Sequence, residues 1–444
     1  MFRFTLFFLL FLLLFSCAPA KKRVEPVSYL PFLGSVDLLD PLNPSAPLKL
    51  FSGSVEGAFA TYRAGQGSAP HWARLVFVYR GDVYVLNLLK GTAEGMKFNC
   101  LNATIADKLV DPLASGAYTT DLNGSYLLNV DRGQLAVLPA SFRFVSFLYP
   151  VKEGELLFLA LSQRELKLCS LKEKLECFGI ASNVLSASLT ARARGTGGAQ
   201  AYALKLNGGT FLLTRSNGKW RLFRSSEPIS SLAFSGGRLY AASGGTVFEL
   251  SGSRLVPVYS LEERGQVKEL LPLRGGVVVA FEREGFLFLK FLHGGEVSVF
   301  DRRPVVLFCK SLGGKLFYNA YNAKCNLSAC LFEPGSGVKC YSSSYWAGYS
   351  VTEKGYNLFL VENEDPETCG GGELFTVSQG GEKIVDLGAL PDYSTFYVFG
   401  VGRWLLGTVT AFSGGRFGKR VVFLDSQTPN SLTFVPGGEG PPVY

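Results

Sequence analysis

Short apolar runs alternate with turn residues along the chain from about Leu50 onward, and no helical period is sustained there. The clearest example is a hairpin in which the apolar runs Leu75–Tyr79 and Val83–Leu86 are joined by Arg80-Gly81-Asp82. Each run is apolar at consecutive positions, which indicates a strand buried on both faces, as when small sheets stack face to face. The pattern therefore predicts many short strands in stacked sheets.

Groups of four such strands recur at a spacing of about 40 residues, which is typical of the blades of a β-propeller. One unit covers 229–259, with four strands separated by three glycine-containing turns, and 268–300 repeats the same order. Two less regular units lie near Ala58 and Ala117, and the unit near Ala117 is expected to be one strand short. Similar units begin near Arg143, Val184, Val305, Tyr349 and Thr395.

The predicted fold class is all-β, with a single β-propeller of four-stranded blades over 49–436 and a short C-terminal tail at 437–444. Eight blades are expected if the two irregular units are partly merged, with seven or nine as the alternatives. A pair of β-sandwiches would also be all-β, but nothing resembling a linker interrupts this region. A closed ring leaves only short, protected sheet edges, which suits an all-β chain of this length.

The N-terminus has the features of an export signal. Arg3 precedes an apolar segment, Phe4–Phe15, that is interrupted only by Thr5. As a helix this segment would be about 18 Å long, against about 30 Å for the core of a bilayer. We therefore expect a signal sequence rather than a transmembrane helix.

Two cleavage sites compete after this segment. Leu14-Phe15-Ser16-Cys17 resembles the lipobox of bacterial lipoproteins, in which the cysteine receives diacylglycerol, although Phe15 is bulkier than the usual residue. Ala18-Pro19-Ala20 has the small-x-small form that ordinary signal peptidase cuts, which would discard Cys17 and release a soluble exported protein. We favour the first interpretation, which predicts a signal peptide at 1–17, lipidation at Cys17 and a Pro-rich tether at 18–48. Ala18, directly after this cysteine, resembles the residue found in lipoproteins sorted to the outer membrane rather than the Asp of those held back. The resemblance therefore implies an outer-membrane or cell-surface location.

Composition narrows the possible partners. Apolar residues make up 47% of the chain and charged residues 18%, with 51 glycines, which suits short strands and excludes disorder for most of the chain. The net charge of +8 is spread thinly, whereas nucleic-acid binding needs a basic stripe on the folded domain, so no nucleic-acid partner is expected. The densest basic cluster, Lys21-Lys22-Arg23, follows the signal and fits a position at a membrane surface.

Eight of the nine cysteines remain when Cys17 is set aside, an even number that can be fully paired in an oxidising compartment. Cys169 and Cys177 flank a turn centred on Glu173, which places them opposite each other and predicts a cross-strand disulfide. A zinc site is the alternative for the others, but no Cys-x-x-Cys spacing occurs, so neither a metal nor a cofactor is predicted. The remaining disulfide candidates, whose connectivity the sequence leaves open, are Cys100, Cys309, Cys325, Cys330, Cys340 and Cys369.

Candidate catalytic groups are scarce. The only histidines, His71 and His293, lie in predicted loops, and neither is assigned a catalytic role. The acidic run Glu362–Glu367 has oxygen ligands suited to calcium, but it lacks alternating ligand spacing and a central glycine, which favours a solvated loop. The basic stretch 191–198 could contact an anionic partner or simply connect two strands.

The order of signal, lipobox-like cysteine, Pro-rich tether and repeated four-strand units resembles bacterial β-propeller lipoproteins, which include the eight-bladed accessory of the outer-membrane β-barrel assembly machine. The resemblance is one of architecture, because the Asp-Gly-containing repeat of that quinoprotein-like family is not found. The fold does not dictate the function, but the scarcity of candidate catalytic groups favours a non-catalytic, lipid-anchored scaffold whose ring presents loops to another envelope protein. The alternative is an exported hydrolase or lyase acting on a glycan or another extracellular substrate, which would need convergent carboxylates or a metal near the ring axis.

Overall fold

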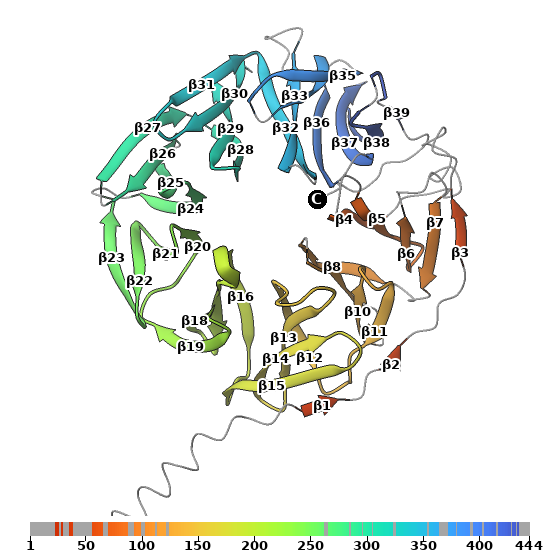
Figure 1. The fold of residues 1–444 in the computed structure, drawn as a ribbon, viewed down its shortest axis with the longest axis vertical. Helices are drawn as coiled ribbons and strands as arrows, with labels where there is room; N and C mark the ends of the chain where they lie inside the picture. The colour runs from red at the N-terminus through yellow and green to blue at the C-terminus, as the bar shows by residue number, and fades with distance from the viewer. Residues whose placement is uncertain are drawn as a thin grey trace, which may run out of the picture.

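The computed structural model is a ring of β-sheets, which confirms the predicted all-β propeller (Figure 1). Strands in the ring run roughly side by side within each sheet, and each sheet packs against the next around a central axis (Figure 1). The structure describes residues 23–25, 28–29, 35–38, 56–64, 70–87, 93–98, 103–111, 113–120, 124–261, 265–283, 286–294, 296–303, 305–322, 326–352, 355–363, 372–378, 380–390, 394–401, 404–413, 416–427, 429–431 and 433–434.

The first four blades each follow the chain from an inner strand beside the axis to an outer strand at the rim. Blade 1 has β4 (Glu56–Ala64), β5 (Pro70–Tyr79), β6 (Asp82–Asn87) and β7 (Ala93–Phe98). Blade 2 has β8 (Thr104–Val110), β9 (Ser115–Thr120), β10 (Ser125–Asn129) and β11 (Gln134–Val137). Blade 3 has β12 (Arg143–Leu148), β13 (Leu156–Ser162), β14 (Glu165–Leu171) and β15 (Leu175–Ser182). Blade 4 has β16 (Ala187–Arg194), the 3-10 turn η1 (Thr196–Gly198), β17 (Gln200–Leu206), β18 (Gly209–Ser216) and β19 (Lys219–Ser225).

The next three blades repeat this order. Blade 5 has β20 (Ser231–Ser235), β21 (Arg238–Ser243), β22 (Thr246–Ser251) and β23 (Arg254–Ser260). Blade 6 has β24 (Gln266–Leu273), β25 (Gly276–Arg283), β26 (Phe286–His293) and β27 (Glu296–Arg303). Blade 7 has β28 (Val305–Leu312), β29 (Lys315–Asn322), β30 (Asn326–Glu333) and β31 (Gly337–Ser342).

The eighth sheet has eight strands, whereas the others have four or five. Its first unit has β32 (Ser344–Thr352), β33 (Gly355–Glu362), β34 (Gly372–Val377) and β35 (Lys383–Leu390). Its second unit has β36 (Ser394–Val401), β37 (Trp404–Ser413), β38 (Arg416–Asp425) and β39 (Thr433–Phe434). The inner strands β32 and β36 pair in parallel, with Gly348 opposite Val398 and Val351 opposite Val401, and so join the two units.

The described strands therefore form eight hydrogen-bonded sheets, as predicted, although the eighth contains two four-stranded units. The merging was expected between the irregular units near Ala58 and Ala117, and the structure places it instead at the C-terminal end of the ring. The unit near Ala117 is also not a strand short, because β8 precedes it. The ring closes where β36 lies beside β4 of blade 1.

Strands in the middle of a blade are buried on both faces. All seven positions of β13 are buried. Phe158 packs with residues of blade 2, whereas its neighbour Leu159 packs with residues of blade 4. Because side chains alternate along a strand, one strand supplies apolar groups to two inter-blade cores. This arrangement explains why the sequence shows consecutive apolar runs.

Inner strands depart from regular pairing in a recurrent way. Among the described strands, seven of the nine inner strands carry a register shift against the second strand of their unit. Bonds between blades lie close to these bulges: Asp107 accepts a hydrogen bond from the Phe147 amide at 3.2 Å, and Ser231 accepts one from the Leu270 amide at 3.0 Å. The inner strands therefore contact one another through polar bonds as well as apolar packing.

Three short strands of the predicted tether lie along the outside of the ring (Figure 1). They are β1 (Arg23–Glu25), β2 (Ser28–Tyr29) and β3 (Ser35–Leu38). Each pairs antiparallel with an outer strand, β1 with β15, β2 with β11 and β3 with β7. The N-terminal segment thus covers the outer edges of blades 3, 2 and 1 in turn.

The direction of the strands gives the ring two distinct faces. We call the side where the inner strands begin the start face, and the side where they end the end face. The first and third turns of each antiparallel blade lie on the end face, whereas the second turn and the connection to the next blade lie on the start face. Within the described residues, no helix has the length and apolar character needed to cross a membrane.

Candidate functional site

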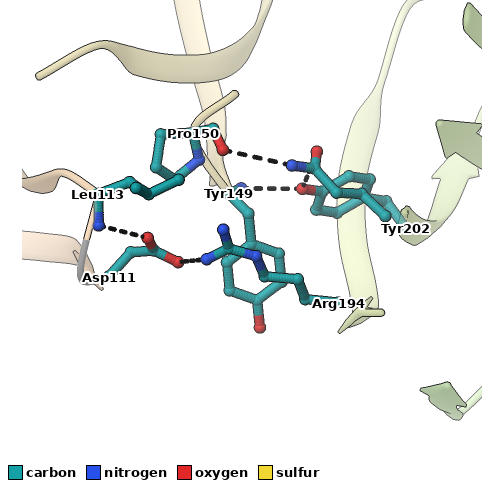
Figure 2. A network of polar contacts seen from close by, with 7 residues as sticks. Asp111, Leu113, Tyr149, Pro150, Arg194 and Tyr202 are labelled. Carbon is teal, nitrogen blue, oxygen red and sulfur yellow. Dashed lines mark hydrogen bonds and ion pairs between the residues drawn. The ribbon is translucent and has the colours of Figure 1, made fainter. Parts of the chain in front are cut away.

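Polar side chains from three blades meet on the end face, where their inner strands end (Figure 2). We call this group the mouth cluster: Asp111, Tyr149, Arg194, Gln200 and Tyr202. Asp111 directly follows β8, Tyr149 directly follows β12, and Arg194 is the last residue of β16. Strand ends of neighbouring blades lie side by side in a propeller, so residues far apart in the sequence are brought together here.

Asp111 and Arg194 form an ion pair between blades 2 and 4. The Asp111 side chain is only 3% exposed and that of Arg194 is 31% exposed. The second carboxylate oxygen of Asp111 accepts a hydrogen bond from the Leu113 amide at 2.9 Å. The Arg194 guanidinium also lies 5.9 Å from the centre of the Tyr149 ring of blade 3. Burying a carboxylate is costly unless it is paired and hydrogen-bonded, and these contacts supply both.

Tyr202 of β17 links blade 4 to blade 3 through neutral hydrogen bonds. Its hydroxyl accepts a hydrogen bond from the Tyr149 amide at 2.8 Å and donates one to the Gln200 side chain at 3.0 Å. The Gln200 amide in turn donates to the Pro150 carbonyl at 3.4 Å. Burial raises the pKa of the Tyr202 hydroxyl, so this group stays protonated and can donate.

Other charged groups lie on the inner strands. Asp107 of β8 accepts hydrogen bonds from the Phe147 amide and the Ser146 hydroxyl of blade 3. Burial lowers the pKa of the neighbouring Lys108 to about 8, and the charge of Asp107 opposes that shift. On the far side of the ring, burial raises the pKa of the Glu269 carboxyl of β24, and Lys310 of β28 opposes it.

The mouth cluster is arranged as a clamp between blades. Its ionic groups bind each other, and its neutral groups are joined in one chain of hydrogen bonds. Beside it, the predicted basic loop 191–198 is β16 as far as Arg194 and continues as the exposed turn η1. In the residues that the structure describes, no group of three or more His, Cys, Asp or Glu side chains is placed to hold a metal ion.

Among the described residues, two disulfides join the third and fourth strands of their blades. Cys169 of β14 and Cys177 of β15 are bonded, with Cα atoms 4.1 Å apart, which confirms the predicted pair. Cys330 of β30 and Cys340 of β31 are bonded in the same position of blade 7. The sequence left this second pairing open. Cys309 lies in β28, where only its backbone is described, whereas Cys17, Cys100, Cys325 and Cys369 lie outside the described residues.

The other candidates from the sequence are dispersed. His293 ends β26 and is exposed, and its Nδ1 lies 2.6 Å from the Gly275 carbonyl oxygen. His71 lies within β5 rather than in a loop, because that strand begins at Pro70. Of the acidic run, Glu362 belongs to β33 and forms an ion pair with Lys383, and 364–367 lie outside the described residues.

The sequence did not indicate the mouth cluster, because its members have no motif and are widely separated. One signal was present nonetheless. Asp111 and Tyr149 each stand directly after an inner strand, and Arg194 closes the next. Polar residues at equivalent positions of consecutive repeats meet at one end of a ring.

Comparison of the chain with protein families gives no match, and comparison with curated protein sequences gives none either. Solved structures do match. A dihydro-heme d1 dehydrogenase, NirN, in complex with DHE is 14% identical, with 85% of this chain and 76% of that chain covered and a TM-score of 0.40. BamB from Moraxella catarrhalis is 12% identical, with 66% and 97% covered and a TM-score of 0.34. A eukaryotic initiation factor is 9% identical, with 77% and 89% covered and a TM-score of 0.47. At these values the likenesses carry no statement about function.

Proposed function

We propose that this protein is exported, is anchored to a membrane through a lipid on Cys17, and acts as a non-catalytic binding scaffold for another protein of the cell envelope. The observation that carries the scaffold proposal is the ion pair between Asp111 and Arg194. These ionic groups at the mouth bind each other and hold blades 2 and 4 together. They support a rigid, pre-formed end face rather than a reaction centre.

Two lines of support favour export. The apolar segment Phe4–Phe15 and Cys17 form a lipobox-like signal. The disulfides Cys169–Cys177 and Cys330–Cys340 lie in outer hairpins, and disulfides of this kind persist in oxidising compartments. Both lines of support favour a location outside the cytoplasm.

The geometry favours the scaffold over a hydrolase or lyase. Such an enzyme would need convergent carboxylates or a metal near the ring axis. In blade 2, Asp107 binds a backbone amide of blade 3 and Asp111 binds Arg194. Both carboxylates therefore stabilise contacts between blades, and we assign no residue a catalytic role.

Fractionation of cells tests the anchor. Wild-type protein should sediment with membranes, and Cys17→Ser should move it to the soluble exported fraction. Membrane association that is unchanged by Cys17→Ser would contradict lipid anchoring.

Co-purification from cross-linked membranes tests the scaffold. An envelope protein should co-purify at a fixed ratio, and Thr196→Trp, which places a bulky ring on the exposed turn η1, should abolish this. The matched control is Ser253→Trp in an exposed outer turn of blade 5, which should leave the ratio unchanged. Equal recovery of the envelope protein with the wild-type protein, Thr196→Trp and Ser253→Trp would contradict binding near the mouth cluster.

A further inference from the structure

The N-terminal strand β1 fixes where the chain leaves the ring toward Cys17. Arg23 lies opposite Cys177 and Glu25 opposite Leu175, so β1 runs antiparallel to β15. A chain traced backward from Arg23 therefore heads toward Ser182, the last residue of β15. That end of β15 lies on the start face, where the chain crosses to β16.

The chain between Cys17 and β1 is short. Six residue steps separate Cys17 from Arg23 and span at most about 20 Å when fully extended. From the position of Cys177, the five steps to the end of β15 cover about 17 Å. Cys17 is therefore no more than about 20 Å from Arg23, a reach that includes the start-face end of β15.

The start face of blades 3 and 4 forms one continuous surface at this point. The connection between the blades, 183–186, binds turns on both sides. The Val184 amide donates to the Arg164 carbonyl at 2.8 Å, and the Leu185 amide donates to the Asn207 side chain at 2.7 Å. The turn of blade 3 at Arg164, the connection and the turn of blade 4 at Asn207 are thus joined by hydrogen bonds.

This surface carries exposed cations and an exposed apolar side chain. Leu185 is 66% exposed, the highest value among the large hydrophobic side chains of the described residues. Glu165 and Glu227 are the half-buried acidic residues of the same rim, and Glu165 pairs with Lys167 at 3.9 Å. The exposed cations of this face extend from the inner strand β12 to the outer strand β19 and are Arg143, Arg164, Lys205 and Arg224.

We infer that the start face of blades 3 and 4 is the membrane-facing surface of the protein, and that its cations bind the anionic phospholipid headgroups of the membrane that holds Cys17. The inference rests on the proposed lipid anchor. Two independent observations support it: the direction of β1 with the small number of residues between it and Cys17, and the charge of the start face toward which β1 points. The end face, with the mouth cluster, is then turned away from the bilayer and open to a protein partner.

Vesicle co-sedimentation tests the surface without the lipid. The probe is the full mature chain carrying Cys17→Ser, mixed with vesicles of phosphatidylcholine alone or with phosphatidylglycerol. The start-face variant carries Arg143→Glu, Arg164→Glu, Lys205→Glu and Arg224→Glu. The end-face control, with the same change in charge on the same two blades, carries Lys172→Glu, Lys174→Glu, Lys219→Glu and Arg221→Glu.

The unmodified surface should bind the anionic vesicles more tightly than the neutral ones. The start-face variant should bind them at least about tenfold more weakly, because each cation at a membrane surface contributes roughly 1 kcal/mol. The end-face control should stay within about twofold, since its charges lie on the side turned from the bilayer. Melting curves confirm that each protein folds, and if the fourfold variant does not, Arg164→Glu with Lys205→Glu replaces it.

The inference would be overturned if both variants lost vesicle binding equally or if only the end-face control lost it. It would also be overturned if the unmodified surface showed no preference for anionic vesicles. None of these outcomes bears on whether Cys17 carries a lipid, because the probe lacks Cys17. Failure of the lipid anchor is detected separately by fractionation of the wild-type protein.

Discussion

Asp111 shows how single residues hold the blades in register. Its carboxylate is almost completely removed from water and is balanced by Arg194 and by the Leu113 amide. A buried charge destabilises the folded state when it has no partner, whereas a buried ion pair often changes the net folding stability very little. The pair therefore specifies how blades 2 and 4 meet more than it adds stability.

Arg194→Ala should lower the free energy of unfolding by roughly 1–3 kcal/mol, because it leaves the Asp111 carboxylate buried without its cation. Adding Asp111→Asn should restore part of this loss, since the amide oxygen can still accept from Leu113 and carries no charge. Urea denaturation measures both, with Arg221→Ala at an exposed position of β19 as the control. Additive losses in the double variant would contradict a coupled pair.

Lys108 should make stability depend on pH. Burial lowers its pKa in the folded protein to about 8, below the usual value near 10.4 that the unfolded chain keeps. Between these two values the unfolded chain binds more protons, so stability should rise as the pH increases from about 8 to about 10. The Lys108→Met variant should lose this rise, and an identical pH profile in both proteins would count against the assignment.

At the scale of elements, outer strands need protection because their free edges can pair with other chains. The protein provides it in two ways. Strands β1, β2 and β3 add a fifth strand to blades 3, 2 and 1. Disulfides fasten the outer hairpins of blades 3 and 7.

Replacing Cys330 and Cys340 together by serine should lower the free energy of unfolding by less than about 3 kcal/mol, the value expected for a loop of 15 residues, because this loop is shorter. Peptide mapping without reduction should recover the 330–340 and 169–177 pairs from the wild-type protein. Recovery of Cys330 or Cys169 bonded to a different cysteine would refute the pairing.

Arg23→Pro should release β1 from β15, because proline cannot donate a hydrogen bond and Arg23 lies opposite Cys177. The Cα atoms of Cys177 and Cys169 are 4.1 Å apart, the spacing of a pair without mutual hydrogen bonds, so the backbone groups of Cys177 face β1. Hydrogen exchange should then accelerate at the outer edge of β15 and remain unchanged in β19 of blade 4. Unchanged exchange in β15 would show that β1 does not protect that edge in solution.

The elements differ in how far the sequence predicted them. Inner strands follow from local apolar runs, and the unit starts near Arg143 and Val305 coincide with the first residues of β12 and β28. The Cys169–Cys177 pair was also local, since a short turn sets its register. By contrast, the pairing of β1 with β15 joins distant segments, and neither segment carries a pattern that identifies the other.

At the scale of the whole molecule, the number of sheets depends on contacts that no repeat pattern contains. The sequence indicated a repeat at each four-strand unit, although the one near Ala117 was expected to be a strand short. The parallel pairing of β32 with β36, which makes one sheet of two units, arises only when the ring closes. The mouth cluster is of the same kind, because its residues become neighbours only after three blades are in place.

We propose that this propeller is held close to a membrane by its N-terminal strands and the short chain to Cys17. Intact-mass measurement of the mature protein, purified from membranes in detergent, tests this account most directly. The account predicts a chain that begins at Cys17 and carries the added mass of a diacylglycerol-type lipid. A mature chain that begins at Lys21, after cleavage behind Ala20, or one that retains Met1, would contradict it.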